Sequence, residues 1–294
     1  MGFVRKLFGK QADKPVASDA PPETAAAPEA AAQPAPRRAR HLRVGSATHT
    51  GLVRTHNEDV LLTFVAEQLG DEASDAFGLF ILADGMGGHQ AGEVASALAA
   101  RTVTREVIEH VYVPYLIHGR PDAQRPLTEA LTQAVDEASQ MVYNNVPGGG
   151  TTLTGVLILN ERAFLAHVGD SRAYLYHNGR LQQLTKDHSY VDKLVELGQL
   201  TMEEAAVHPQ KNVLYRAVGQ EGELEVDTHI ETIPAGGRLL LCCDGLWSMI
   251  GDEEIQRIVG GAATPQAACD QMVAAANAAG GRDNITAVVV EMDA

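Results

Sequence analysis

The stretch VLILNERAFLAHVGDSRAYLY, residues 156–176, holds three short apolar runs separated by two polar turns. The turns occupy residues 160–162 and 169–172. Apolar runs of this length, bounded by turn residues, are typical of β-strands. Because connections this short cannot join parallel neighbours, the pattern predicts an antiparallel meander of three strands.

Helical periodicity appears on both sides of this meander. Apolar side chains recur at helical spacing in residues 91–112 and 127–146. The apolar stripe of the second segment consists of Leu127, Leu131, Val135, Ala138 and Val142. A third helix is predicted to begin at Thr264 and Pro265, since threonine caps helices and proline fits the first turn, and to end near Gly280 and Gly281. It leads into a turn and a terminal strand within residues 282–292.

Antiparallel strands combined with a few amphipathic helices predict an α+β domain. A four-layer αββα sandwich, with two mainly antiparallel sheets flanked by helices, would accommodate this many apolar strands, although periodicity alone leaves the layering open. The 294 residues, 45% hydrophobic and 21% charged, suit one globular domain with a tail. Residues 11–40 are mostly Ala, Pro, Glu and Asp, so we expect a disordered tail over residues 1–41 and a globular domain over residues 42–294.

The charge is unevenly distributed along the chain. Residues 1–40 carry seven basic and four acidic residues, whereas the remainder carries 16 basic and 34 acidic residues. An acidic body repels nucleic acid and anionic membranes, so we expect no nucleic-acid partner. Any affinity for phosphate must then come from local cations, either arginine or bound metal.

The three cysteines and the N-terminal segment bear on location. Cys242, Cys243 and Cys269 are odd in number and match no zinc spacing, which indicates buried thiols in a reducing compartment, the cytoplasm. The first ten residues, MGFVRKLFGK, lack the apolar core of a signal peptide, and no apolar run approaches the roughly 20 residues of a membrane helix. We expect no stable membrane anchor, and a monomer.

Acidic residues stand at the ends of the predicted strands. In LFILADGMGGH (79–89) and in LLLCCDGLW (239–247), an apolar run leads directly into Asp-Gly. The acidic residues at predicted strand ends or turns are Glu58, Asp59, Asp84, Asp170, Asp244 and Asp283. A single Asp-Gly is often only a turn. Several crowded carboxylates cannot all ionise without cations between them. Ligation by oxygen alone favours Mg²⁺ or Mn²⁺ over zinc, so the set predicts a divalent metal site.

Eight motifs in one order make the chain recognisable. They are RTHNED (54–59), LADGMGGH (82–89), GTTLTG (150–155), HVGDSRAYL (167–175), LTKDHS (184–189), RAVG (216–219), LLLCCDGLW (239–247) and GRDNITAVVV (281–290). Together they resemble the metal-dependent serine/threonine protein phosphatases of the type 2C (PPM) family, in its bacterial branch. The resemblance covers nearly all of the chain from residue 42, which makes residues 42–294 the expected catalytic domain.

The resemblance implies a binuclear Mn²⁺ or Mg²⁺ centre at one end of a β-sandwich, where a metal-bridging water attacks phosphorus directly. By motif position, Asp84 bridges both ions and the carbonyl of Gly85 is a further ligand. Asp244 and Asp283 complete one metal site and Glu58 the other. Asp170, together with Asp244, corresponds to the ligands of a more weakly bound third ion.

The remaining implied roles concern the substrate and the supporting residues. Arg54 corresponds to the arginine that grips the substrate phosphate, so Arg54, Asp84 and Asp244 form the expected catalytic core. Asp59 and Asn284 support the metal centre from behind. Met86 stands where many eukaryotic members have histidine, and the nearby His89 is not at that position, so the general acid is left unassigned.

The resemblance also implies phosphorylated proteins as substrates and a bacterial Ser/Thr kinase as the opposing enzyme. Two other functions stay open from the sequence: hydrolysis of small phosphate esters, and non-catalytic phosphoprotein binding on the same fold. Residues 189–213 lie where bacterial relatives have a mobile flap. Their helical pattern, interrupted at Gly198 and Pro209, fits either a lid over the site or an ordinary pair of surface helices.

Overall fold

The computed structural model describes residues 41–67, 76–87, 90–118 and 125–293. Residues 1–40 of the predicted tail, which include the N-terminal decapeptide, and His89 lie outside these residues. The described residues belong to one compact unit. None of their helices is both long enough and apolar enough to cross a membrane.

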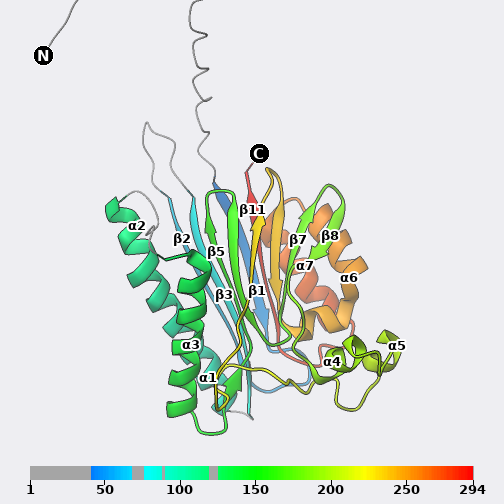
Figure 1. The fold of residues 1–294 in the computed structure, drawn as a ribbon. Coiled ribbons are helices and arrows are strands. Elements are labelled where there is room, and N and C mark those ends of the chain that lie inside the picture. Colours follow the sequence, from blue (N-terminus) through cyan, green and yellow to red (C-terminus); the bar gives the residue numbers. More distant parts are fainter. Residues whose placement is uncertain (1–40, 68–75, 88–89, 119–124, 294) are drawn as a thin grey trace, which may run out of the picture. The chain divides into compact units, whose positions relative to one another are not determined.

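Two antiparallel sheets form the inner layers (Figure 1). The first has the order β1 (Leu42–His49), β11 (Ile285–Met292), β10 (Arg238–Cys242), β7 (Arg172–His177) and β8 (Arg180–Gln183). The second has the order β2 (Asp59–Ala66), β3 (Phe77–Met86), β5 (Leu153–Leu159), β6 (Arg162–Val168) and β9 (Asp227–Thr232), with β4 (Gly150–Thr151) paired to the end of β3.

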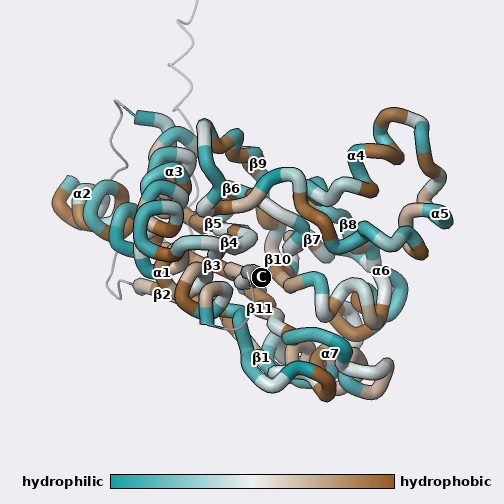
Figure 2. Tube along the Cα trace, turned by 90° about the horizontal axis from the view of Figure 1, so that it is seen from below, coloured by the Kyte–Doolittle hydropathy of each residue, from teal (hydrophilic) through white to brown (hydrophobic). Residues whose placement is uncertain are grey.

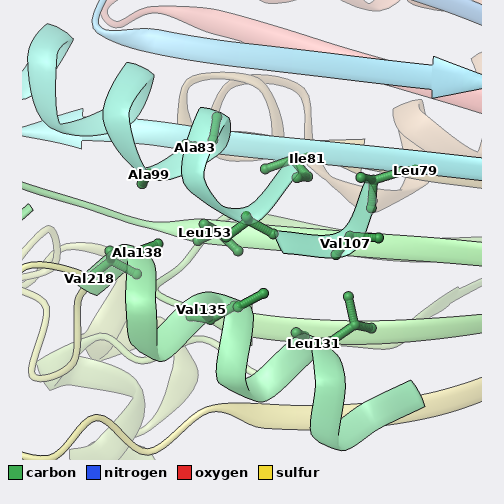
Figure 3. Close-up of a cluster of buried hydrophobic side chains, with 14 of the residues drawn as sticks. Leu79, Ile81, Ala83, Ala99, Val107, Leu131, Val135, Ala138, Leu153 and Val218 are labelled. Carbon is green, nitrogen blue, oxygen red and sulfur yellow. The ribbon is translucent and has the colours of Figure 1, made fainter. Parts of the chain in front are cut away.

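Helices cover the outer face of each sheet. α1 (Gln90–Val107) and α3 (Leu127–Asn145) pack on the second sheet, and α6 (Asp244–Gly261) and α7 (Pro265–Ala278) pack on the first. Figure 3 shows Leu131, Val135 and Ala138 of α3 in one cluster with side chains of β3 and β5. The predicted α+β class and αββα layering are therefore confirmed.

Alternation along β10 explains why residues 239–243 are all apolar. Leu239, Leu241 and Cys243 lie in the cluster between the two sheets, whereas Leu240 and Cys242 face the helices. Both faces are buried over residues 239–243, so each of these positions is apolar, whereas Arg238 at the start of β10 is partly exposed. All three cysteines are buried free thiols, as predicted.

The helix predictions hold with one omission. α3 begins at Leu127, and α7 begins at Pro265 behind Thr264, whose side-chain oxygen accepts a hydrogen bond from the Ala267 N–H. The first predicted helix is observed as α1, continued by a five-residue π-helix η1 (Ile108–Tyr112) and by α2 (Val113–His118). Helix α6, which starts directly at Asp244, was not predicted.

The meander prediction is wrong at its second turn. β5 and β6 do form an antiparallel pair, but β7 pairs with β10 and β8 in the other sheet. Residues 169–171 are a corner that carries the chain from one sheet to the other. A short connection excludes parallel pairing, but it does not require both strands to share a sheet.

The segment between β8 and β9 carries two short helices, α4 (Tyr190–Glu196) and α5 (Met202–Ala206). Ser189 caps α4, and Thr201 with Glu204 forms a capping box on α5. Gly198 follows α4 with a φ of +67°, which favours glycine. Figure 2 shows both helices set apart from the two sheets, and these local caps contribute to their stability.

Candidate active site

The acidic residues of the strand ends meet at one end of the sandwich. Asp84 lies near the end of β3 and is the direct cross-strand partner of Asp59, the first residue of β2. Asp244 follows β10, and Asp283 precedes β11, its antiparallel neighbour. Because the end of one antiparallel strand lies beside the start of the next, residues distant in sequence are brought together.

These residues surround a cavity of about 290 Å³. Its lining includes Arg54, Glu58, Asp84, Gly85, Asp170, Asp244, Asp283 and Asn284. Asp170 enters from the corner between β6 and β7. Of the predicted site residues, only Asp59 is not in the lining; it is buried beside Asp84.

The carboxyl groups are crowded and desolvated. Burial raises the pKa of Asp84 and of Asp170 well above the usual range, and in both cases neighbouring acids add to the effect. Burial and Asp283 raise the pKa of Asp244 to about 6. Bound cations would stabilise the charged carboxylates and so lower these pKa values. A site that supplies carboxylate and carbonyl oxygens suits hard divalent ions.

Asp59 provides an independent test of that fit. Its Oδ2 accepts a 2.6 Å hydrogen bond from the Thr286 hydroxyl, while its buried Oδ1 has no hydrogen-bond partner among the described residues. Burial raises the pKa of Asp59 to about 7. Nearly all buried polar atoms are paired in folded proteins, so an unpaired carboxyl oxygen beside Asp84 fits a bound ion or its water.

Cys243 lies in the same cluster but does not suit a metal ligand. The Asp59, Asp84 and Cys243 atoms capable of ligation lie within 4.8 Å of one another. Burial raises the pKa of the Cys243 thiol well above its usual range, and the thiol donates to the Asn284 carbonyl at 3.3 Å. The thiolate is the form that binds metals, so the protonated thiol favours the carboxylate oxygens as candidate ligands.

Asn284 fastens the loop before β2 to the start of β11. Its Oδ1 accepts from the Glu58 N–H at 2.8 Å, and its Nδ2 donates to the carbonyls of Thr50 and His56, each at 2.9 Å. This loop carries both Arg54 and Glu58. These three bonds link the loop at residues 50–58 to the start of β11.

Arg54 lies at the edge of the cavity with half of its side chain exposed. One guanidinium nitrogen donates to Asp283 Oδ2 at 2.7 Å, and this bond raises the pKa of Arg54. The Asp283 Oδ1 accepts from the Asn284 N–H at 2.9 Å. An exposed guanidinium beside buried acids supplies a local positive charge in an acidic protein.

Two close glycine contacts allow α1 to approach the cavity. A Cβ on Gly92 would lie 2.2 Å from Glu58 Oε2, and a Cβ on Gly85 would lie 2.3 Å from the Gly92 carbonyl oxygen. The Gly85 N–H donates to the Glu58 carbonyl at 3.1 Å. Any larger side chain at either glycine would displace Glu58 or the first turn of α1.

Sequence reasoning missed three contributors to the site. Thr152 bonds the Asp84 backbone twice, through its N–H at 2.9 Å and its hydroxyl at 3.0 Å. Trp247 donates from Nε1 to the Asp170 carbonyl at 3.0 Å, and the Arg172 guanidinium lies 3.6 Å from the indole centre. Leu214 lines the cavity from the end of the α4–α5 segment. Only the tryptophan, the single one in the chain, offered a sequence signal.

The sequence pattern of the family described as Protein phosphatase 2C matches residues 55–286. The chain belongs to the protein phosphatase 2C family. This family is metal-dependent, and the predicted family is confirmed.

Bacterial relatives give the same result over nearly their full lengths. The serine/threonine phosphatase stp of Listeria monocytogenes is 38% identical over 247 residues, covering 84% of this chain and 94% of the relative. The structure of the Mycobacterium tuberculosis serine/threonine phosphatase PstP/Ppp has a TM-score of 0.68 and 34% identity, covering 86% of this chain and 99% of the other.

A structure of the catalytic domain of PstP in complex with two manganese ions has a TM-score of 0.67 and 32% identity. It covers 87% of this chain and 100% of the PstP chain. Family, fold and relatives agree, and the present protein phosphatase 2C is a metal-dependent serine/threonine phosphatase.

Proposed function

We propose that this phosphatase removes phosphate from phosphoserine and phosphothreonine in proteins at the carboxylate cavity, and that it opposes a bacterial Ser/Thr kinase. The observation that carries the proposal is the convergence of acids from separate strand junctions on one cavity with Arg54 at its edge. In an acidic chain, this is where an anionic phosphate can be held by local positive charge.

The metal ligands are proposed residue by residue. Asp84, the Gly85 carbonyl, Asp244, Asp283 and Glu58 hold two divalent ions. Asp170, from the corner between the sheets, holds a weaker third ion together with Asp244. Mn²⁺ is supported by the manganese complex of PstP, and Mg²⁺ has the same preference for oxygen ligands. When bound, the ions supply a water nucleophile at neutral pH and neutralise charge on the phosphoryl oxygens.

Arg54 binds the phosphate group of the substrate. Its planar guanidinium can donate two parallel hydrogen bonds to phosphate oxygens, a geometry that lysine lacks. In the structure it donates to Asp283 and is half exposed, so it can turn toward a phosphate without leaving the cavity edge. Asp59 and Asn284 act from behind, by keeping an acceptor beside Asp84 and by holding the loop that carries Arg54.

The α4–α5 segment is proposed to act as a lid that screens substrates. Asn212 and Leu214, at its return to the core, line the cavity. Movement of the segment would therefore change the cavity wall itself, rather than only the surface beyond it. Met86 also lines the cavity and carries no transferable proton, so the proton for the leaving serine or threonine does not come from that position.

Substrate class is tested by comparing a phosphothreonine peptide with mononucleotides, each with Mn²⁺ and with EDTA. We expect Mn²⁺-dependent release of phosphate from the peptide at a kcat/KM at least about tenfold above that for nucleotides, because binding beyond the phosphate lowers the barrier. Faster turnover of nucleotides would assign the protein to small phosphate esters. Tight phosphopeptide binding without turnover would indicate a non-catalytic regulator.

The remaining proposals concern the surroundings of the enzyme. The buried free thiols of Cys242, Cys243 and Cys269 support a reducing compartment, the cytoplasm. We propose residues 42–294 as the catalytic domain, a monomer without a stable membrane anchor. A protein that begins at residue 40 should then retain the kcat/KM of the full chain for the phosphothreonine peptide.

A further inference from the structure

The base of the α4–α5 segment, here called the neck, consists of residues 188–190 and 213–215. The two strands of the neck run antiparallel and are joined at Ser189 and Leu214. The Tyr190 N–H donates to the Val213 carbonyl at 2.7 Å, and the Tyr215 N–H donates to the His188 carbonyl at 3.0 Å. The chain enters and leaves the α4–α5 segment through these residues, and an ion pair between Lys186 and Glu196 adds a side-chain contact.

His188 connects the neck to the corner between the sheets. Its side chain is almost completely buried, at 1% exposure. Its backbone N–H donates to the Gly169 carbonyl at 2.8 Å, and the Gly169 N–H donates to His188 Nδ1 at 3.1 Å. One residue of the neck thus pairs with both polar backbone groups of Gly169, directly before Asp170.

The hydrogen bond from Gly169 defines the tautomer of the ring. A backbone N–H can only donate, so Nδ1 is unprotonated and the ring hydrogen is on Nε2. Nε2 then donates to Asp227 Oδ2 at 3.2 Å. Arg216 lies 3.1 Å from Nε2 and donates instead to Asp227 Oδ1 at 2.8 Å. The ring is therefore fixed at both nitrogens.

The corner at residues 169–171 is closely packed and held by hydrogen bonds. Gly169 has a φ of +111°, and a Cβ there would lie 2.6 Å from Thr152 side-chain atoms. The Ser171 hydroxyl is 2.9 Å from the Thr152 hydroxyl, and the Asp170 carbonyl accepts from Trp247. The residues before and after Asp170 and its own carbonyl are thus all fixed by contacts. The contact that comes from the neck is the one between His188 and Gly169.

We infer that His188 is a positioning residue that ties the neck of the α4–α5 segment to Asp170 through the backbone of Gly169. A change in the segment would thereby alter the placement of an acid in the cavity, in addition to the access of substrate. This inference rests on the proposed function only for the role of Asp170. The alternative is a histidine that merely fills buried space.

Two substitutions separate these alternatives, because they mimic different halves of the ring. In His188→Asn the side-chain oxygen falls near Nδ1 and keeps an acceptor for the Gly169 N–H. In His188→Gln the side-chain amide nitrogen falls near Nε2 and keeps the donor to Asp227, while the acceptor for Gly169 is lost. Both variants remove the same ring from buried space.

The first readout is hydrogen–deuterium exchange of the Gly169 amide, followed by NMR in glycine-labelled, metal-free protein. We expect exchange in His188→Gln to be about fivefold to tenfold faster than in His188→Asn, which corresponds to one lost hydrogen bond. The Gly155 amide in β5 is the internal control and should not differ between the variants. Equal exchange at Gly169 in the two variants would overturn the inference.

The second readout is the Mn²⁺ concentration that gives half-maximal hydrolysis of a phosphothreonine peptide. His188→Gln should require about fivefold more Mn²⁺ than His188→Asn, with a similar KM for the peptide. Identical requirements would contradict the role assigned to His188. A wild-type protein without Mn²⁺-dependent turnover would refute the proposed function, and the exchange comparison would still decide the role of His188.

A milder variant covers the case in which neither histidine variant folds. Asp227→Ala removes the partner of Nε2 from a partly exposed position and leaves the buried ring in place. The freed ring should speed exchange of the Gly169 amide by about threefold, as expected for a weakened hydrogen bond. An unchanged rate in Asp227→Ala would overturn the inference.

Discussion

For Asp244, the proposed role in metal binding and the effect on stability are opposed. Its half-buried carboxyl group lies near Asp84 and Asp283, and desolvation together with the charge of Asp283 raises its pKa to about 6. At pH 8 this group is charged, and in the metal-free protein its charge lowers the stability of the folded state. In Asp244→Asn the metal-free protein should therefore be more stable than wild type by roughly 1 to 3 kcal/mol, since one pKa unit corresponds to about 1.4 kcal/mol.

Urea unfolding at pH 8 in the presence of EDTA measures this difference. The matched control is Asp270→Asn, because Asp270 lies on the exposed face of α7, where the change should stay within about 0.5 kcal/mol. A metal-free Asp244→Asn protein less stable than wild type would show that the carboxylate is satisfied without cations.

The residues of the site were predictable from sequence to different degrees. Asp84 stands at the end of an apolar run within β3 and Asp244 follows the apolar strand β10, where a carboxylate is conspicuous, and Asp283 precedes β11. Thr152 was missed because threonine is common in strands, and its two bonds to the Asp84 backbone depend on how β3 and β4 end. A carboxylate at the end of an apolar run can be recognised in the sequence. A side chain that supports the site through hydrogen bonds to the backbone can be recognised only in the structure.

At the scale of elements, the start of α1 determines where Glu58 can lie. In Gly92→Ala the new methyl group would collide with the Glu58 carboxylate, since a Cβ at this position would lie 2.2 Å from Oε2. We expect a loss of about 1 to 3 kcal/mol in stability from overpacking and a tenfold or greater loss of kcat/KM.

The comparison for this variant is Gly261→Ala at the end of α6, where a Cβ would meet no atom within 4 Å. That change should leave activity unaltered. Thermal melting and peptide hydrolysis of the two variants, measured in parallel, provide the test. Equal behaviour of the two alanine variants would mean that the approach of α1 to the site tolerates displacement.

The α4–α5 segment gives a second prediction at this scale. Replacing residues 192–211 by a short Gly-Ser linker keeps the neck pairing of Tyr190 with Val213. If the segment screens protein substrates, the KM for a phosphothreonine peptide should change at least about fivefold, while kcat for p-nitrophenyl phosphate changes less than about threefold. Parallel loss on both substrates would indicate a general structural role.

Elements were predicted best where the pattern is local. The cap and proline at Thr264 and Pro265 place the start of α7, because those signals act within one turn. The corner at residues 169–171 was misread, since the choice of sheet depends on distant strands. Helix α6 was missed because Asp244 follows a continuous apolar run and Gly251, with a φ of +67°, interrupts the helical pattern.

For the whole molecule, the buried acids set the dependence of stability on pH. The folded-state pKa values of Asp59 and Asp244, about 7 and about 6, lie above those of the unfolded chain. The folded protein therefore holds protons that the unfolded chain releases between about pH 4 and pH 7. Stability of the metal-free protein consequently falls as pH rises through this window.

Differential scanning calorimetry with EDTA at pH 5.5 and pH 8 tests this dependence. The metal-free melting temperature should be lower at pH 8, and Mn²⁺ should raise it more at pH 8 than at pH 5.5, because protons compete for the ligands. Burial lowers the pKa of His167 to about 3 and also lowers that of His188, so these two groups act in the opposite direction near pH 6.5. The raised pKa values of Asp84 and Asp170 act in the same direction as those of Asp59 and Asp244. A metal-free protein that is more stable at pH 8 would contradict the assignment.

The central claim is that the acids at the end of the sandwich hold the divalent cations that drive phosphate release. The most direct measurement is phosphate release from a phosphothreonine peptide during Mn²⁺ titration of wild type and Asp244→Asn, with EDTA as the zero point. We predict no turnover in EDTA, saturable activation of wild type, and a loss of at least about a thousandfold in the variant. Turnover in EDTA, or a variant as active as wild type, would contradict the account.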